Sequence, residues 1–121
     1  MRNASPTLYN VRVLHGNHDT VAICEGELDA ITATEYGGVP AIGIPGAATW
    51  RPIYREILSG PRRILVVGDG DDAGRAFSER ICGELDNAVP ITVPDELDVN
   101  KYFCRYGGPR LARLLRERKD R

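Results

Sequence analysis

Four short apolar runs, separated by stretches with helical periodicity, constrain the fold of this chain more than any other feature. The runs are rich in Val and Ile and occupy residues 21–24, 41–44, 64–67 and 89–93. Buried strands that alternate with helices form a parallel sheet, because the chain must cross over the sheet before it begins the next strand. The sequence therefore predicts an α/β fold with an open, mainly parallel sheet of about four strands and helices on both faces.

The predicted helices rest on apolar residues spaced three and four positions apart and on glycine and proline stops. They cover residues 27–36, 50–58, 73–85, 99–106 and 109–121. Pro90 indicates that the last strand lies at an edge of the sheet, since proline has no N–H to donate to a second neighbour.

The length of 121 residues predicts a single domain. Within it, residues 1–19 are an N-terminal ribbon or loop, residues 20–98 the core that carries the chemistry, and residues 99–121 the C-terminal helices. The formal net charge of −1 provides no general basic field, so any contact with nucleic acid must be local or bridged by a metal ion. The three cysteines fit neither a disulfide framework nor a zinc pattern, and no apolar run reaches membrane-spanning length. These features favour a cytoplasmic protein without membrane contact.

Acidic residues gather directly after three of the four predicted strands. Glu25 and Asp29 follow the first strand, Asp69 and Asp71 follow the third, and the segment ending at Asp98 follows the fourth. The carboxyl ends of parallel strands meet at one edge of the sheet, which is where open α/β sheets bind ligands. We therefore expect these carboxylates to lie close together.

Carboxylates that converge from separate strands repel one another unless a cation neutralises them. Mg²⁺ prefers oxygen ligands and commonly takes one or two protein carboxylates while it keeps waters and substrate phosphates in its other positions. The sequence therefore predicts a Mg²⁺ site, with Mn²⁺ as an alternative ion, of the kind used in phosphoryl transfer.

At these residues the chain resembles the Toprim family, found in bacterial-type and bacteriophage DNA primases. The first motif of that family is a strand ending in Glu-Gly with an acid three residues later, as in Glu25-Gly26 and Asp29. The second is Asp-x-Asp, as in Asp69 and Asp71, followed by a small pair and a basic residue, Arg75.

Other segments extend the resemblance over nearly the whole chain. Asp98-Val99-Asn100 is similar to a later acidic motif of the primase branch, and residues 8–10 and 46–50 are similar to phage primase-helicases. The motifs are short and weak singly, whereas their order and their positions at strand ends are more specific.

The resemblance implies a Toprim fold and a role for each acid. Glu25 would be a general base or metal-linked catalytic acid, and Asp69 and Asp71 would be catalytic metal ligands, with Glu25 sharing the metal. Asp29 and Asp98 would be outer-shell or second-metal residues, and Arg75 would bind phosphate or pair with Asp71 or Asp72.

The implied activity is primer synthesis by nucleotidyl transfer during DNA replication, with a DNA template and nucleotide triphosphates as partners. Primases of this family carry a basic subdomain and usually a zinc-binding element before the Toprim domain, and the sequence begins too late for either. We therefore expect an excised fragment, a split-gene product that works with a separate basic or zinc-binding subunit, or a small stand-alone Toprim protein. In isolation primer synthesis should be weak or absent, and a replicative helicase is a further expected partner. If the chain is phage-encoded, its location is the host cytoplasm.

Several alternatives stay open on the residues alone. The resemblance also covers a Toprim-type nuclease, a topoisomerase fragment, or a non-enzymatic replication module that retains the acids as a relic. A receiver domain clusters acids at strand ends, and residues 68–73 fit a dinucleotide-binding loop formally, although three aspartates would face the pyrophosphate. The arginines of residues 110–121 favour ordinary packing over DNA contact, because Glu117 and Asp120 interrupt them and leucines form a stripe among them.

Overall fold

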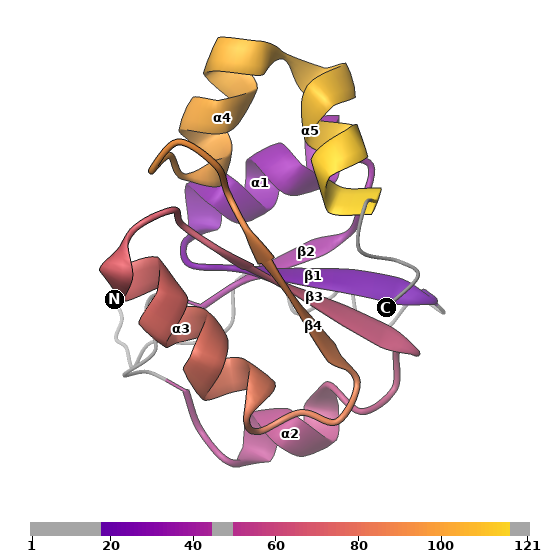
Figure 1. The fold of residues 1–121 in the computed structure, drawn as a ribbon. Helices are drawn as coiled ribbons and strands as arrows, with labels where there is room; N and C mark the ends of the chain where they lie inside the picture. Colours follow the sequence, from indigo (N-terminus) through magenta and orange to yellow (C-terminus); the bar gives the residue numbers. More distant parts are fainter. Residues whose placement is uncertain (1–17, 45–49, 117–121) are drawn as a thin grey trace, which may run out of the picture.

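A computed structural model describes residues 18–44 and 50–116, so the ambiguous N-terminal segment up to residue 17 lies outside the described part (Figure 1). Four strands form one parallel sheet in the order β2-β1-β3-β4. Their bounds are Thr20–Cys24 for β1, Ala41–Gly43 for β2, Arg63–Gly68 for β3 and Ala88–Thr92 for β4. The predicted α/β architecture is confirmed, and β4, which contains Pro90, lies at an edge as expected.

Five helices accompany the sheet in the described part of the chain. They are α1 (Glu27–Tyr36), α2 (Ile53–Ile57), α3 (Asp72–Cys82), α4 (Val99–Tyr106) and α5 (Gly108–Arg116). The second helix begins three residues later than predicted, because Pro52 has no N–H and suits the start of a helix better than its interior. Trp50, which the prediction placed in this helix, is instead buried before it begins. The predicted end of the last helix, residues 117–121, lies outside the described residues.

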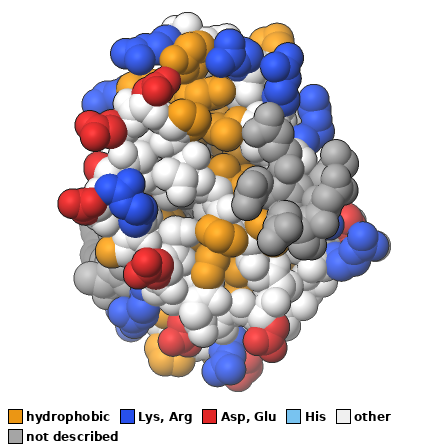
Figure 2. Space-filling view, in the orientation of Figure 1, with side chains coloured by type: hydrophobic (Ala, Val, Ile, Leu, Met, Phe, Trp, Pro, Cys, Tyr) orange, Lys and Arg blue, Asp and Glu red, His pale blue; other side chains and the backbone are white. Residues whose placement is uncertain are grey.

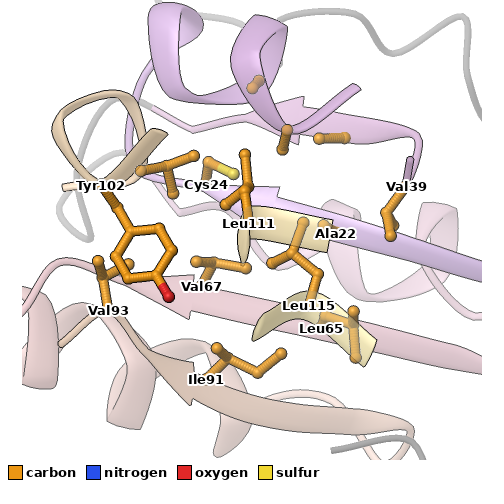
Figure 3. Packing of buried hydrophobic residues seen from close by; sticks show 14 residues of the cluster. Ala22, Cys24, Val39, Leu65, Val67, Ile91, Val93, Tyr102, Leu111 and Leu115 are labelled. Atoms are coloured by element: carbon orange, nitrogen blue, oxygen red, sulfur yellow. The ribbon is translucent and has the colours of Figure 1, made fainter. Parts of the chain in front are cut away.

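The two faces of the sheet bury separate hydrophobic clusters, because successive side chains of a strand point to opposite sides. Ala22, Leu65 and Val67 face α1, α4 and α5 in one cluster (Figure 3). Ile23 and Val66 face α2 and α3 in the other. Figure 1 shows the same division, with α1, α4 and α5 above the sheet and α2 and α3 below it. Helices therefore cover both faces, as the sequence predicts.

The strand order places a topological switch point between β1 and β3. The chain moves from β1 to β2 on one side, and then returns to form β3 on the other side of β1. Helices that follow the two strands leave toward opposite faces, since α1 packs in one cluster and α3 in the other. Open α/β sheets bind ligands in the crevice at the carboxyl ends of such strands. The described fold thus singles out the ends of β1 and β3.

The remaining sequence expectations concern membranes and cysteines. None of the described helices combines the length and the apolar character that crossing a membrane requires. Cys24, Cys82 and Cys104 are all free. Cys24 is fully buried at the carboxyl end of β1. Burial raises the pKa of its thiol well above the usual value and so favours the protonated, unreactive form.

Candidate metal centre

Glu25 and Asp69 meet at the switch point. Each is the first residue after its strand, and Cys24 pairs with Val67, so that the two strand ends lie side by side. The backbone N–H of Asp69 donates a hydrogen bond to Oε2 of Glu25 over an N–O distance of 3.2 Å. Of the acids that the sequence predicts to lie close together, Glu25 and Asp69 are the two that a hydrogen bond joins directly in the described part of the chain.

The carboxylate of Asp69 lies in an unfavourable environment. Its Oδ1 atom is buried and accepts no hydrogen bond from the described residues. The pKa of Asp69 is raised from 3.8 to about 7, first by burial, and then by the negative charges of Glu25 and Asp29, a side-chain hydrogen bond with Glu25 and the charge of Asp98. A buried oxygen without a donor costs free energy that a bound cation would offset.

Asp29 supports the same edge from the first turn of α1. Its side chain is only 8% exposed, and its Oδ1 accepts a hydrogen bond of 3.0 Å from the backbone N–H of Asn100. Burial raises the pKa of Asp29 to about 6, with the charges of Asp98 and Glu25 adding to the rise. Asp29 therefore links α1 to the start of α4 beside the Glu25–Asp69 pair.

Asp71 and Asp98 both cap helices. Asp71 accepts a hydrogen bond of 2.7 Å from the N–H of Gly74 at the start of α3, and Asp98 accepts one of 2.7 Å from the N–H of Lys101 at the start of α4. Side-chain oxygens at this position satisfy backbone donors that the helix leaves free. In the described part of the chain, no hydrogen bond joins Asp71 to Glu25 or Asp69.

Arg75 forms an ion pair with Asp72, one of the two partners weighed from the sequence, and both side chains are largely exposed. An exposed pair of this kind contributes little to stability. Its guanidinium stands one helical turn beyond Asp71, so a phosphate would have to compete with Asp72 for it.

Two substitutions of Asp71 distinguish its role as a helix cap from a role as a metal ligand. Asp71→Ala should lower the free energy of unfolding by about 1 kcal/mol because the cap is lost, whereas Asp71→Asn should change it by less than about 0.5 kcal/mol because Asn also caps. Urea unfolding of the two variants measures this. Equal losses in both would show that the charge, and not the cap, stabilises α3. Mn²⁺ affinity of the well-capped Asn variant then reports directly on a ligand role for Asp71.

A strained turn that the sequence did not reveal closes over the acidic loop. Asp95 and Glu96 have positive φ angles of 61° and 57°, which non-glycine residues rarely adopt. The turn is held by a hydrogen bond of 2.7 Å from the Tyr106 hydroxyl to Oδ2 of Asp95, and by the N–H of Gly70, which donates to the carbonyl of Leu97 over 3.0 Å. Tyr106 therefore helps to position the site, and no local sequence pattern could indicate it because its partner lies on another segment.

The carboxylate oxygens at this edge are the kind of ligand that a hard divalent cation prefers, but they do not surround an ion completely. Within residues 18–44 and 50–116, no three His, Cys, Asp or Glu side chains form a group that could hold a metal ion. The geometry instead offers the Glu25–Asp69 pair, with a buried free oxygen on Asp69. Mg²⁺ commonly binds through one or two carboxylates, with waters and phosphates completing the shell. The pair therefore fits Mg²⁺ or Mn²⁺ better than it fits zinc.

Asp69→Asn should raise the free energy of unfolding at about pH 8 without divalent ions, by about 1 kcal/mol after allowance for screening at a half-buried site. An acid whose pKa is higher in the folded chain binds more protons when folded, so the wild type loses stability as pH rises from 3.8 to about 7. Asn carries no charge, so the variant lacks this loss. Urea unfolding in EDTA across this pH range measures the difference, and parallel profiles for the two proteins would contradict it.

A separate hollow of about 1020 Å³ lies at the opposite end of the sheet. It is lined by residues that precede β3 and β4, among them Arg55, Arg62, Glu84 and Asn87. Its size does not make it the site, because its charges are mixed and exposed and it is remote from the carboxyl ends of the strands.

This chain is similar in sequence to one phage protein and similar in fold to solved primase structures. No protein-family model matches the chain. The gene 57 protein of Mycobacterium phage D29 is 40% identical over 107 residues, covering 88% of this chain and 70% of that protein. A DNA primase domain from Pseudomonas aeruginosa is similar with a TM-score of 0.72 at 21% identity, over 89% of this chain and 36% of that chain.

The primase fragment of the bacteriophage T7 primase-helicase protein is also similar, with a TM-score of 0.71 at 22% identity, over 86% of this chain and 46% of that chain. The chain thus spans less than half the length of these two primase chains. At these identities the likeness is one of fold, and it confirms that the sheet and its helices have the architecture of primase catalytic regions.

Proposed function

We propose that this chain, which belongs to the family of the gene 57 protein of Mycobacterium phage D29, is a metal-dependent nucleotidyl-transfer domain of the DNA primase type with a Toprim fold. The fold likeness to a bacterial primase domain and to a phage primase fragment supports this class of activity. The Toprim assignment rests on the Glu-Gly and Asp-x-Asp motifs at the ends of β1 and β3.

One observation carries the proposal: Asp69 meets Glu25 at the switch point with its Oδ1 buried and without a hydrogen-bond donor among the described residues. A structural carboxylate normally has its buried oxygens satisfied. A buried oxygen without a donor among the described residues, beside a second carboxylate, is what a cation site requires.

In the proposed mechanism Glu25 and Asp69 would hold Mg²⁺, with Asp71 as the further ligand that the family resemblance implies. The ion would supply neutralisation of charge on the triphosphate, whose α-phosphorus is attacked by a 3′ hydroxyl with release of pyrophosphate. Glu25 would accept the proton of that hydroxyl, and Asp29 would keep α1 and α4 in register beside it through its bond to Asn100. The turn at Asp95 would limit the space above Gly70.

The partners belong to the same proposal. The two similar primase chains contain further regions beyond the part that matches, so we propose that a basic or zinc-binding primase element and a replicative helicase work with this domain. The substrates are nucleotide triphosphates and a DNA template.

Metal titration and two activity assays test this function. Calorimetric titration should show that the full chain binds Mn²⁺ and Mg²⁺. In the first activity assay, with single-stranded DNA and ribonucleoside triphosphates, the chain alone should synthesise few short primers, and addition of a primase basic subdomain should increase their yield. The second assay measures nicking of a supercoiled plasmid. Absence of metal binding would overturn the proposal. Nicked plasmid without primers would indicate a nuclease, and tight helicase binding without either activity would indicate an interaction module.

A further inference from the structure

Helices α4 and α5 form a segment of one charge sign. Residues 99–116 contain five cations and no Asp or Glu: Lys101, Arg105, Arg110, Arg113 and Arg116. The other 103 residues hold 11 Lys and Arg and all 17 Asp and Glu, a formal charge of −6. The near-neutral net charge of the chain is therefore the sum of a basic segment, which forms α4 and α5, and an acidic remainder.

The cations of α5 lie on its outer side. Leu111 and Leu115 are 0% and 1% exposed and pack against the sheet (Figure 3). Arg110, Arg113 and Arg116 are exposed and spaced three residues apart, which places them in one stripe on the other side of the helix. Figure 2 shows Lys and Arg gathered over the end of the molecule that α4 and α5 form.

Within residues 18–44 and 50–116, no ion pair involves the cations of α4 and α5. The ion pairs of the described residues are Arg62 with Asp19 and Arg75 with Asp72, and neither involves α4 or α5. The guanidinium carbon of Arg110 lies 4.6 Å from the centre of the Tyr106 ring. Beside it, exposed Tyr36 stacks on Phe103 with ring centres 4.3 Å apart. Aromatic rings thus accompany the arginines on this surface.

Helix stability alone does not account for the pattern. Cations near a helix C-terminus interact favourably with the helix dipole, which would explain Arg105, Arg113 and Arg116. Lys101 and Arg110 lie in the first turns of α4 and α5, where the dipole favours acids. Cations that are placed against the dipole and have no ion-pair partner among the described residues point to a ligand that carries negative charge.

We propose that the exposed face of α4 and α5 binds the phosphate backbone of single-stranded nucleic acid and directs it toward the Glu25–Asp69 pair. Four of the five cations are arginine, whose planar fork matches phosphate oxygens, and Tyr36 and Tyr106 offer rings for stacking with bases. The choice of nucleic acid over other polyanions rests on the proposed function.

This face is continuous with the carboxylate edge. The start of α4 contacts Asp29 through the N–H of Asn100, and its end contacts the Asp95 turn through Tyr106. A strand held along α4 would therefore reach the edge where the acids lie. Because the face itself contains no acid of the metal pair, its binding can be measured without divalent ions and independently of catalysis.

The test measures binding of the full chain to fluorescein-labelled oligodeoxythymidylate of about 20 nucleotides in EDTA across a salt series. The triple variant Arg105→Gln, Arg113→Gln, Arg116→Gln should bind at least about tenfold more weakly at about 0.1 M salt, and the slope of log K against log salt should fall in magnitude by about 2. Arg110 is left in place because its guanidinium carbon lies 4.6 Å from the centre of the Tyr106 ring, closer than the 6.0 Å of Arg105.

A matched control removes three exposed arginines elsewhere: Arg51→Gln, Arg55→Gln, Arg80→Gln. It should bind like the wild type, and a triple Arg→Lys variant at positions 105, 113 and 116 should retain the salt slope. Equal weakening in the control, or no binding by the wild type in EDTA, would overturn the proposal. So would binding to polyglutamate or phosphatidylserine vesicles as tight as binding to DNA. Binding in EDTA together with no primer synthesis would refute only the proposed function.

Discussion

Replacing Gly74 with Ala should destabilise the chain by more than about 3 kcal/mol, the largest effect on stability expected of any substitution considered for this protein. A Cβ at this position would lie 2.0 Å from the carbonyl oxygen of Asp69 and 2.6 Å from its backbone N. These atoms belong to the loop between β3 and α3, so they cannot move aside as a flexible side chain would. The first turn of α3 can pack back on this loop only because residue 74 has no side chain.

Urea unfolding followed by circular dichroism measures the loss, with Gly60→Ala as the matched control. A Cβ at Gly60 meets nothing within 4 Å, so this change should alter the free energy of unfolding by less than about 0.5 kcal/mol. A Gly74→Ala protein as stable as the wild type would mean that the acidic loop is packed more loosely than described, which would also weaken the case for a preorganised metal pair.

Replacing Glu25 with Gln should abolish metal-dependent activity while folding stays intact. Gln keeps an oxygen that can accept the N–H of Asp69, but it removes the charge that a divalent ion needs. Loss of groups that merely orient ligands costs about 10- to 100-fold in metal affinity, so loss of a ligand should cost at least that much. We expect Mn²⁺ affinity to fall by about 100-fold or more and primer synthesis by about 1000-fold.

Glu27→Gln is the matched control for this variant, because Glu27 is exposed, lies two residues further on and changes the net charge equally. Mn²⁺ titration and primer synthesis should leave the control close to the wild type, and the thermal midpoints of both variants should agree with it. If the two variants lose metal affinity equally, the effect is one of general charge, and Glu25 is not a ligand.

Strand and helix positions could be predicted well from the sequence, because burial of a strand on both faces requires a continuous apolar run and each run stands between helical patterns. The strands of the structure begin and end within one or two residues of the predicted runs. There were two exceptions among the helices. Pro52 sets the start of α2, so that Trp50 enters the core instead of the helix, and α3 ends at Cys82, three residues before the predicted end, because Gly83 caps it. A buried tryptophan and a helical one have the same local pattern, and only tertiary packing separates them.

The candidate site was predictable only in part. That acids follow β1, β3 and β4 is local information, and it directed attention to the carboxyl ends of the strands. Which acids meet depends on strand order, since Glu25 and Asp69 are 44 positions apart and Asp29 and Asn100 are 71 apart. The capping role of Asp71 also depended on where α3 begins.

The sequence by itself determined the alternation of strands and helices, the single charge sign of residues 99–116 and the acids at the strand ends, because each is a property of neighbouring residues. Only the tertiary structure decided that β1 and β3 are adjacent, that an oxygen of Asp69 is buried without a donor among the described residues, and that the arginines of α5 face outward. These depend on contacts between distant segments, whose energies are set by packing and burial and not by local pattern.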